Sequence, residues 1–230
     1  SLTSTHGHRV ARRFLFSDGG FCGRESSCAN LRLYKGVPMK LLEDRIRRDG
    51  HIGAGNVLKV DCFLNHQIDV PFISALGEEF YRLYKDAGIT KILTIEASGI
   101  GIACLTAMHF GVPVLFAKKT PTNNIYGDIY TAEVYSYTHE RTYTIYVSRQ
   151  FLTPDDRVLI IDDFLAKGSA LKALLSLIES AGAQVAGAGI VIEKAYQDGG
   201  ALIRDMGVRV ESLARISAMS EEAGVTFVEE

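Results

Sequence analysis

Two adjacent aspartates, Asp162 and Asp163, stand directly after a run of apolar residues, Val158 to Ile161. The run contains only valine, leucine and isoleucine, which is typical of a strand buried on both faces of a parallel sheet. Open α/β sheets bind their ligands at the carboxyl ends of such strands. Two carboxylates there can accept hydrogen bonds from a diol or help to hold hydrated Mg²⁺. We therefore expect Asp162 and Asp163 to be catalytic residues.

A short loop follows the two acids and leads into a helix expected over Leu171–Ser180. Such a loop directs several backbone N–H groups to one point, and the helix dipole adds positive potential there, so a phosphate fits it. The carboxylates cannot hold this phosphate, because like charges repel. A phosphate beside a diol and a metal is the pattern of a ribose 5-phosphate. The loop residues expected to bind it are Ala166, Lys167, Gly168, Ser169 and Ala170.

The stretch from Val158 to Gly168 resembles the phosphoribosyl-pyrophosphate (PRPP) motif of the type I phosphoribosyltransferases. In that family the two acids bind the ribose 2′- and 3′-hydroxyls, and the loop binds the 5′-phosphate. The resemblance implies an α/β fold with a central, mostly parallel sheet flanked by helices, a small hood subdomain and a flexible β-hairpin lid. It also implies a homodimer and PRPP as co-substrate with Mg²⁺, which PRPP would mainly hold, with Asp162 and Asp163 as its protein contacts. The alternative is a buried strand ending in a helix cap, although a cap needs only one acid.

A second loop, Glu96–Gly101, follows an expected strand and opens an expected helix. By position it resembles the family's pyrophosphate loop, which often contains a cis non-proline peptide bond. The resemblance assigns Ala97, Ser98 and Gly99 to PRPP binding, together with the cations Lys118 and Lys119 at the end of the next strand. In the family such a lysine comes from either subunit of the dimer. An ordinary strand-to-helix turn and a solvated strand end are the alternatives.

The family's lid corresponds to the stretch Thr120–Ala132, expected as a long exposed loop, and to a hairpin over Glu133–Thr138 and Thr142–Ser148. A lid is needed because the reaction passes through a ribosyl cation that water would capture.

The residues expected to bind the purine are Lys194 and residues of the segment Val57–Asp69. The segment resembles the hood of the bacterial xanthine phosphoribosyltransferases, where the residues corresponding to Leu58 and Asn65 contact xanthine. In the purine enzymes a lysine at the position of Lys194 donates to the 6-oxygen. Adenine carries a donor amine there, so a lysine favours oxopurines. The resemblance thus implies a purine-salvage enzyme that forms xanthosine 5′-monophosphate (XMP) and pyrophosphate.

The chain departs from one branch of the family at Ala166. Hypoxanthine-guanine enzymes carry a third acid there, near the purine N7, so no general base follows from the motif. Partial ionisation of xanthine itself, near Lys194, is our hypothesis for the missing base. Two rival functions stay open: a hypoxanthine-guanine or adenine enzyme, and a purine repressor that senses PRPP without catalysis. Such repressors carry a winged-helix domain, for which the stretch before Met39 is too short and irregular.

Helix and strand patterns alternate from Met39 onward, which indicates a parallel sheet with right-handed crossovers. Helices are expected over Met39–Asp49, Pro71–Ala87, Gly99–Phe110, Leu171–Ser180 and Ala201–Met206. Besides the run after Arg157, strands are expected over Val57–Val60, Lys91–Glu96, Pro113–Lys118, Gln184–Glu193, Arg209–Ala214 and Val225–Val228, the last two as edge strands. A polar loop is expected over Asp61–Asp69.

Composition and charge argue against a nucleic-acid-binding protein and against a membrane protein. The chain has 230 residues, 47% hydrophobic and 23% charged, with a formal net charge of -2. Nucleic-acid binders carry a basic excess, and membrane proteins carry long apolar runs, neither of which is present here. We therefore expect no nucleic-acid or membrane partner, only small-molecule substrates, and a cytoplasmic protein whose cysteines are free thiols.

The chain divides into an extension and one domain. Residues 1–38 have no counterpart in the family, and we expect a disordered or artificially added segment, with a small basic arm as the functional alternative. Residues 39–230 are expected to form the phosphoribosyltransferase domain. Within it, the hood would comprise about 39–68 plus the C-terminal strands, and the core about 69–215.

Overall fold

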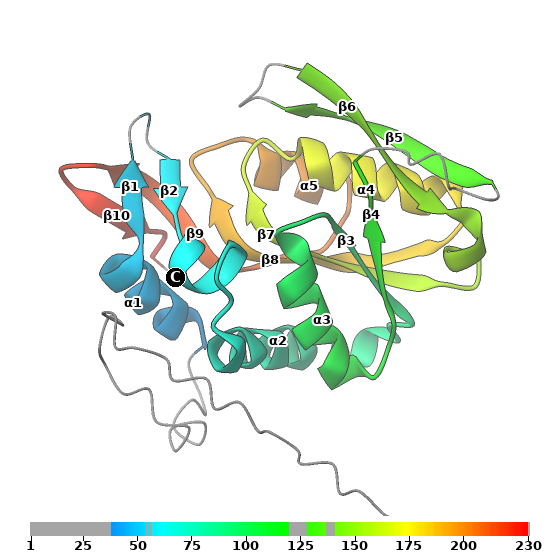
Figure 1. The fold of residues 1–230 in the computed structure, drawn as a ribbon, viewed down its shortest axis with the longest axis horizontal. Coiled ribbons are helices and arrows are strands. Elements are labelled where there is room, and N and C mark those ends of the chain that lie inside the picture. The colour runs from blue at the N-terminus through cyan, green and yellow to red at the C-terminus, as the bar shows by residue number, and fades with distance from the viewer. Residues whose placement is uncertain (1–37, 54, 56, 120–127, 137–140, 230) are drawn as a thin grey trace, which may run out of the picture. The chain divides into compact units, whose positions relative to one another are not determined.

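The computed structural model describes residues 38–229, apart from 54, 56, 120–127 and 137–140 (Figure 1). The extension expected over residues 1–38 therefore lies outside the described residues, except for Pro38. None of the described helices is long and apolar enough to cross a membrane.

A six-stranded sheet forms the centre of the described domain, in the order β10-β9-β8-β7-β3-β4. Neighbouring strands are parallel from β9 to β4, and only β10 runs antiparallel to its neighbour β9. This confirms the expected α/β fold with a mostly parallel sheet. The strands are β3 (Lys91–Ile95), β4 (Val114–Ala117), β7 (Arg157–Leu165), β8 (Gln184–Lys194), β9 (Val210–Ser220) and β10 (Gly224–Phe227).

The expected apolar strand is the middle of β7, with β8 and β3 on its two sides. All four residues from Val158 to Ile161 are fully buried, as a strand covered on both faces requires. The strand does not stop at the two acids, because Phe164 and Leu165 still pair with β8. Asp162 and Asp163 are thus held inside the last paired segment of the sheet and not in the loop after it.

One expectation about the sheet was wrong. Arg209–Ala214 was expected to be an edge strand, but β9 lies between β8 and β10 and is eleven residues long. Val210 to Ile216 pair with β8, and Ile216 to Ser220 pair with β10. The expected stretch therefore pairs only with β8, and the extra length of β9, which the sequence pattern did not predict, pairs with β10.

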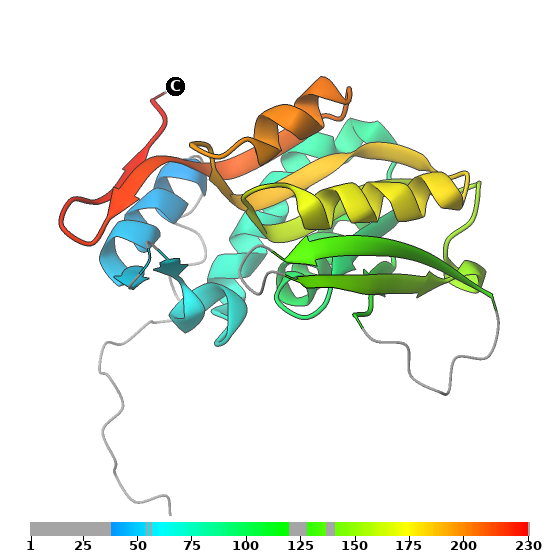
Figure 2. The same cartoon turned by 90° about the horizontal axis from the view of Figure 1, so that it is seen from above.

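Helices cover both faces of the sheet (Figures 1 and 2). One face packs against α2 (Val70–Tyr84) and α3 (Gly99–Phe110), and the other against α4 (Ser169–Ser180) and part of α5 (Gly199–Asp205). Alternate residues of β7 pack into the hydrophobic clusters on the two faces of the sheet, because successive side chains of a strand point to opposite faces.

A long β-hairpin adds to the α4 side. Its strands are β5 (Ile129–Ser136) and β6 (Arg141–Ser148), in full antiparallel register. The hairpin is joined to the sheet through a bridge between Lys118 and Tyr146. The expected hairpin is therefore present, but β5 begins inside the stretch expected as a loop over Thr120–Ala132. The rest of that stretch, residues 120–127, lies outside the described residues.

The N-terminal part of the domain consists of α1 (Pro38–Asp49), β1 (His51–Gly53), β2 (Val57–Lys59) and a π-helical turn, Asp61–Asn65. Here the expectation of a polar loop over Asp61–Asp69 was partly wrong, and β1 was not expected. The turn forms because Phe63 packs edge-on against Phe72, with ring centroids 5.6 Å apart, and the Arg45 guanidinium lies over both rings. Burying Phe63 and Leu64 turns Asn65 toward the sheet.

Candidate active site

The two acids are buried at the carboxyl end of β7, with Asp162 5% and Asp163 7% exposed. Oδ1 of Asp162 accepts the backbone N–H of Asp163 at 3.0 Å. Oδ2 of Asp163 accepts from the side-chain amide of Asn65 at 3.0 Å, and Oδ1 accepts the N–H of Phe164 at 3.1 Å. Burial, followed by the negative charge of Asp163, raises the pKa of Asp162 well above its ordinary value. The pair thus combines an acid that favours its protonated form with a hydrogen-bonded neighbour.

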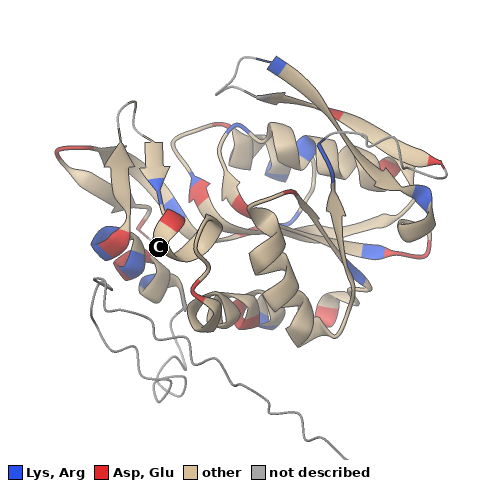
Figure 3. Cartoon of the chain, viewed as in Figure 1, with Lys and Arg blue, Asp and Glu red and all other residues tan. Residues whose placement is uncertain are grey.

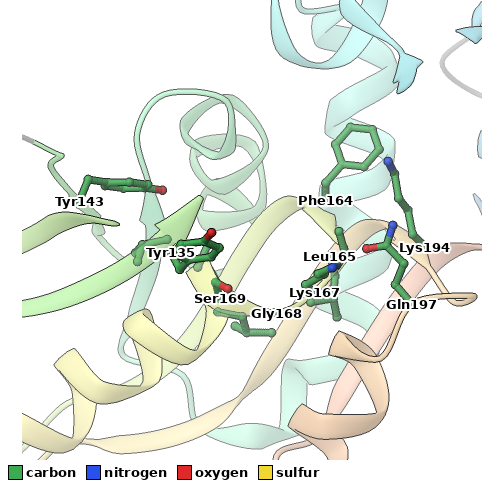
Figure 4. A pocket seen from close by; sticks show the side chains of 13 residues that line it. Tyr135, Tyr143, Phe164, Leu165, Lys167, Gly168, Ser169, Lys194 and Gln197 are labelled. Carbon is green, nitrogen blue, oxygen red and sulfur yellow. The ribbon is translucent and has the colours of Figure 1, made fainter. Parts of the chain in front are cut away.

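A cavity of about 390 Å³ lies where β7 ends, and its lining begins at Phe164, the residue that follows the acid pair (Figure 4). The loop from Ala166 to Ala170 forms its floor, at the N-terminus of α4. Gly168 adopts a left-handed conformation with φ of +81°, which glycine reaches without strain. The backbone N–H groups of the first turn of α4 and its dipole make this end of the cavity suited to an anion. The cavity is lined by Val134, Tyr135, Tyr143, Phe164, Leu165, Ala166, Lys167, Gly168, Ser169, Ala170, Leu171, Lys194 and Gln197.

Lys194 ends β8 and lines the same cavity, as its position beside β7 led us to expect. Its side chain and the ring of Phe164 project in the same direction, away from the loop (Figure 4). Burial lowers the pKa of Lys194 below its ordinary value. Figure 3 shows acidic and basic residues together at the carboxyl ends of β7 and β8.

The second loop joins the site through Gly99. The peptide bond between Glu96 and Ala97 is cis, as in the loop that it resembles. A side chain on Gly99 would collide with the hydroxyl of Thr94 and would lie 3.0 Å from Oδ1 of Asp162. Gly99 therefore passes close to Asp162, an approach that only a glycine at this position allows.

Lys119 is held beside this loop. Its backbone N–H donates to Oε1 of Glu96 at 2.7 Å, and its ammonium lies 5.6 Å from the centroid of the Tyr143 ring. The charge of Lys119 opposes the rise in the pKa of Asp162, as the smallest of the effects on that acid. Lys119 is thus close enough to the acid pair to act on it electrostatically.

Of the expected site residues, the described lining of this cavity contains Lys194 and the loop Ala166–Ala170. Lys118 and Leu58 have other surroundings. The Lys118 ammonium lies 5.9 Å from the centroid of the Phe116 ring and lines a separate cavity beside β4 and β6. Leu58 is buried in the core, and its Cδ1 lies 3.3 Å from where a Cβ on Gly50 would be. Neither belongs to the described lining of the cavity that contains Lys194.

Sequence reasoning missed Tyr135, Tyr143, Phe164 and Gln197 as residues of the cavity. The signal for Phe164 was its place next to the acids. The tyrosines lie on the expected hairpin, but the face of the hairpin that meets α4 depends on packing, which the alternating pattern alone does not specify.

Comparison with known proteins identifies the family. The Phosphoribosyl transferase domain family matches residues 70–205. The xanthine phosphoribosyltransferase of Lachnoclostridium phytofermentans is 58% identical over 186 residues, covering 81% of this chain and 96% of the relative. The xanthine phosphoribosyltransferase of Bacillus cereus strain AH187 is 50% identical over 192 residues, covering 84% of this chain and 97% of the relative.

Solved structures support the fold. The adenine phosphoribosyltransferase of Trypanosoma brucei is similar with a TM-score of 0.66 at 20% identity, covering 80% of this chain and 83% of that chain. The enzyme from Rhodothermus marinus has a TM-score of 0.63 at 22% identity, covering 78% of this chain and 98% of that chain. The sequence relatives, which are far more similar, decide the branch: the chain belongs to the xanthine phosphoribosyltransferase family and is a phosphoribosyltransferase with the type I fold.

Proposed function

We propose that the crevice at the carboxyl ends of β3, β7 and β8 transfers the 5-phosphoribosyl group of PRPP to xanthine, giving XMP and pyrophosphate. The observation that carries this proposal is that Lys194 and the loop from Ala166 to Ala170 line one cavity beside the acid pair. A donor for an oxopurine and an anion-binding loop thus line one cavity, and the two carboxylates lie on β7, the strand that leads into the loop.

The loop and the first turn of α4 would bind the 5′-phosphate. Backbone N–H groups bind an oxyanion without the flexibility of long side chains, so the ribose is anchored at a fixed point. This binding energy, made far from C1, can be used to hold the ribose in the reactive geometry. Tyr135 and Tyr143 of the hairpin would cover this end of the site, because both line the same cavity.

Asp162 and Asp163 would orient the ribose hydroxyls. Asp163 accepts hydrogen bonds from its surroundings and is suited to accept one from a hydroxyl. A carboxylate beside the ring also favours the positive charge that develops on the ribosyl group as pyrophosphate departs. Asp162, whose pKa burial raises, is suited to share a proton with a neighbouring oxygen.

The departing pyrophosphate would be bound by the loop Ala97–Gly99 and by Lys119. We also propose Mg²⁺ as the companion of PRPP. No cluster of three or more acidic, histidine or cysteine side chains is found among the described residues, whereas Mg²⁺ with a phosphate substrate needs only one or two carboxylates. Asp162 and Asp163 can supply these, and the ion would offset charge on the pyrophosphate.

Lys194 would donate to the 6-oxygen of the purine, and the amide of Asn65 would address the 2-oxo edge that hypoxanthine lacks. Leu58 lies in the core, so its contribution to xanthine binding would come from its main chain. With Ala166 in place of a third acid, we propose that the ionisation of xanthine itself, next to Lys194, replaces a dedicated base.

The surroundings of the site are also part of the proposal. Residues 39–68 and the C-terminal strands would form the hood over the purine. We propose a homodimer in which Lys118, which lines a different cavity beside β4 and β6, binds PRPP of the partner subunit. The described cysteines, Cys62 and Cys104, are free thiols, which supports a reducing compartment such as the cytoplasm.

A purine competition assay tests this function. Purified protein receives limiting PRPP and Mg²⁺ with equal xanthine, hypoxanthine, guanine and adenine, and the nucleotides are separated by chromatography. We expect XMP as the main product. Equal use of hypoxanthine would remove the specificity proposed for Asn65, and PRPP that stays uncleaved in every mixture would remove the catalytic proposal.

A further inference from the structure

The first residue of α5, Gly199, contacts the backbone of the loop Ala166–Ala170. The backbone N–H of Gly199 donates to the carbonyl oxygen of Ala166 at 3.1 Å. A Cβ on Gly199 would collide with that oxygen and would lie 2.6 Å from the backbone N of Gly168. These neighbours are backbone atoms that cannot rotate away as a side chain does. Any side chain at position 199 must therefore move either α5 or the loop.

An ion pair with a buried carboxylate joins α5 to β8 close to this contact. Glu193, on β8, is 2% exposed and pairs in register with Leu165, the residue just before the loop. Its two carboxylate oxygens accept from the two terminal nitrogens of Arg204, on α5, at 2.8 Å each. Two parallel hydrogen bonds fix the orientation of the guanidinium relative to the carboxylate as well as the distance between them. Arg215 adds a weaker contact at 3.4 Å.

The helix approaches the carboxylate closely because its second residue is also glycine. A Cβ on Gly200 would collide with Oε1 of Glu193 and would lie 2.7 Å from Nη1 of Arg204. Burial alone would raise the pKa of Glu193, but the hydrogen bonds and charge of Arg204, with the charge of Arg215, outweigh it, and the pKa is lowered. The carboxylate thus stays charged when buried, and it keeps α5 in place.

We propose that Gly199 and the Glu193–Arg204 ion pair form a positioning device, here called the α5 clamp, that sets the shape of the loop Ala166–Ala170 for PRPP. None of these three residues lines the cavity, so they act through the loop. The inference rests on the proposed role of this loop as the site of the 5′-phosphate. Lys194 follows Glu193 directly, so the clamp also links the purine lysine to the phosphate loop.

Steady-state kinetics with both substrates test the clamp. Gly199→Ala, which leaves the ion pair intact, should lower kcat/KM for PRPP by about 10- to 100-fold, with a much smaller change in KM for xanthine. Its control is Leu202→Ala on the same helix, because the Leu202 side chain is exposed and is absent from the described lining of the cavity. Wild-type kinetics for PRPP in Gly199→Ala would overturn the proposal.

The ion pair is tested by Arg204→Gln and Arg204→Lys. The glutamine variant should raise KM for PRPP, and the lysine variant should recover part of the loss, because lysine restores the charge but not the two-bond geometry. Arg209→Gln is the control, since Arg209 pairs with Glu211 on the exposed side of β9. A fall in melting temperature with both KM values unchanged would show a merely structural role and overturn the proposal. If Arg204→Gln does not fold, Gly199→Ala and Arg204→Lys decide the question.

One further variant separates this inference from the function on which it rests. Ser169→Asp places a negative charge in the loop and should abolish PRPP use, because like charges repel. If Ser169→Asp retains full activity, the loop is not the phosphate site and the proposed function fails. If Ser169→Asp is inactive while Gly199→Ala and Arg204→Gln behave as wild type, only the clamp is refuted.

Discussion

The side-chain amide of Asn65 donates a 3.0 Å hydrogen bond to the carboxylate of Asp163, a residue 98 positions away in the chain. The contact joins the π-helical turn to the last paired segment of β7. It connects the residue proposed to read the purine with one of the acids proposed to hold the ribose. The two substrates would therefore meet at a shared hydrogen-bonding centre.

Replacing Asn65 by Ala should weaken xanthine binding and also leave an oxygen of Asp163 without its donor. A lost hydrogen bond to a charged group costs about 1.5–3 kcal/mol, so we expect KM for xanthine to rise by about tenfold or more. Gln67→Ala is the matched control, because Gln67 is an exposed amide two residues further on that bonds only weakly, at 3.4 Å, to the carbonyl of Cys62. Similar KM values in both variants would speak against the role of Asn65.

The two acids should differ in their response to amide substitution. Asp163→Asn replaces the carboxylate proposed to orient the ribose, and we expect kcat to fall by about 10²- to 10³-fold, a loss typical of a removed electrostatic contact. Asp162→Asn should lower kcat by a smaller factor, because asparagine resembles the protonated form that burial favours at Asp162. Both variants should fold, as circular dichroism will show. Unchanged turnover in Asp163→Asn would refute its assignment.

Stability should change with pH in a way that identifies Asp162. The pKa of Asp162 is higher in the folded protein than in the unfolded chain. The protonated carboxyl therefore stabilises the fold fully at pH values below the pKa of the unfolded chain, and this stabilisation is lost as the pH rises through the pKa of the folded protein. Asp162→Asn cannot ionise, so its melting temperature should exceed that of the wild type at neutral pH and approach it in acid. Calorimetric melting from pH 4 to 8 measures the difference. Asp155→Asn, at an exposed acid, should show no such trend, and a pH-independent difference for Asp162→Asn would contradict the assignment.

Lys194→Gln should shift purine preference. A glutamine can turn its carbonyl toward the amine of adenine, whereas lysine only donates. We expect KM for xanthine to rise more than KM for PRPP, and the ratio of kcat/KM for adenine to that for xanthine to increase. Lys172→Gln, on the exposed face of α4, is the control. An equal loss for xanthine and PRPP would count against a purine-reading lysine.

Much of this protein could be read from local patterns. The buried run of β7, the two acids and the small-residue loop are contiguous, so their order alone predicted where the phosphate and the ribose are proposed to bind. The bounds of α3 were predicted to the residue, because Gly99 and Gly111 bracket an unbroken helical segment. Fold class followed in the same way, since alternating strands and helices admit few arrangements other than a parallel sheet.

Tertiary structure alone decided which side chains meet. Tertiary packing produces the contact between Asn65 and Asp163, the bridge between Lys118 and Tyr146, the burial of Leu58 and the approach of Gly199 to Ala166. The physical reason is that residue type and spacing specify local conformation, whereas the direction of a side chain, its burial and the resulting shift in pKa depend on what packs against it.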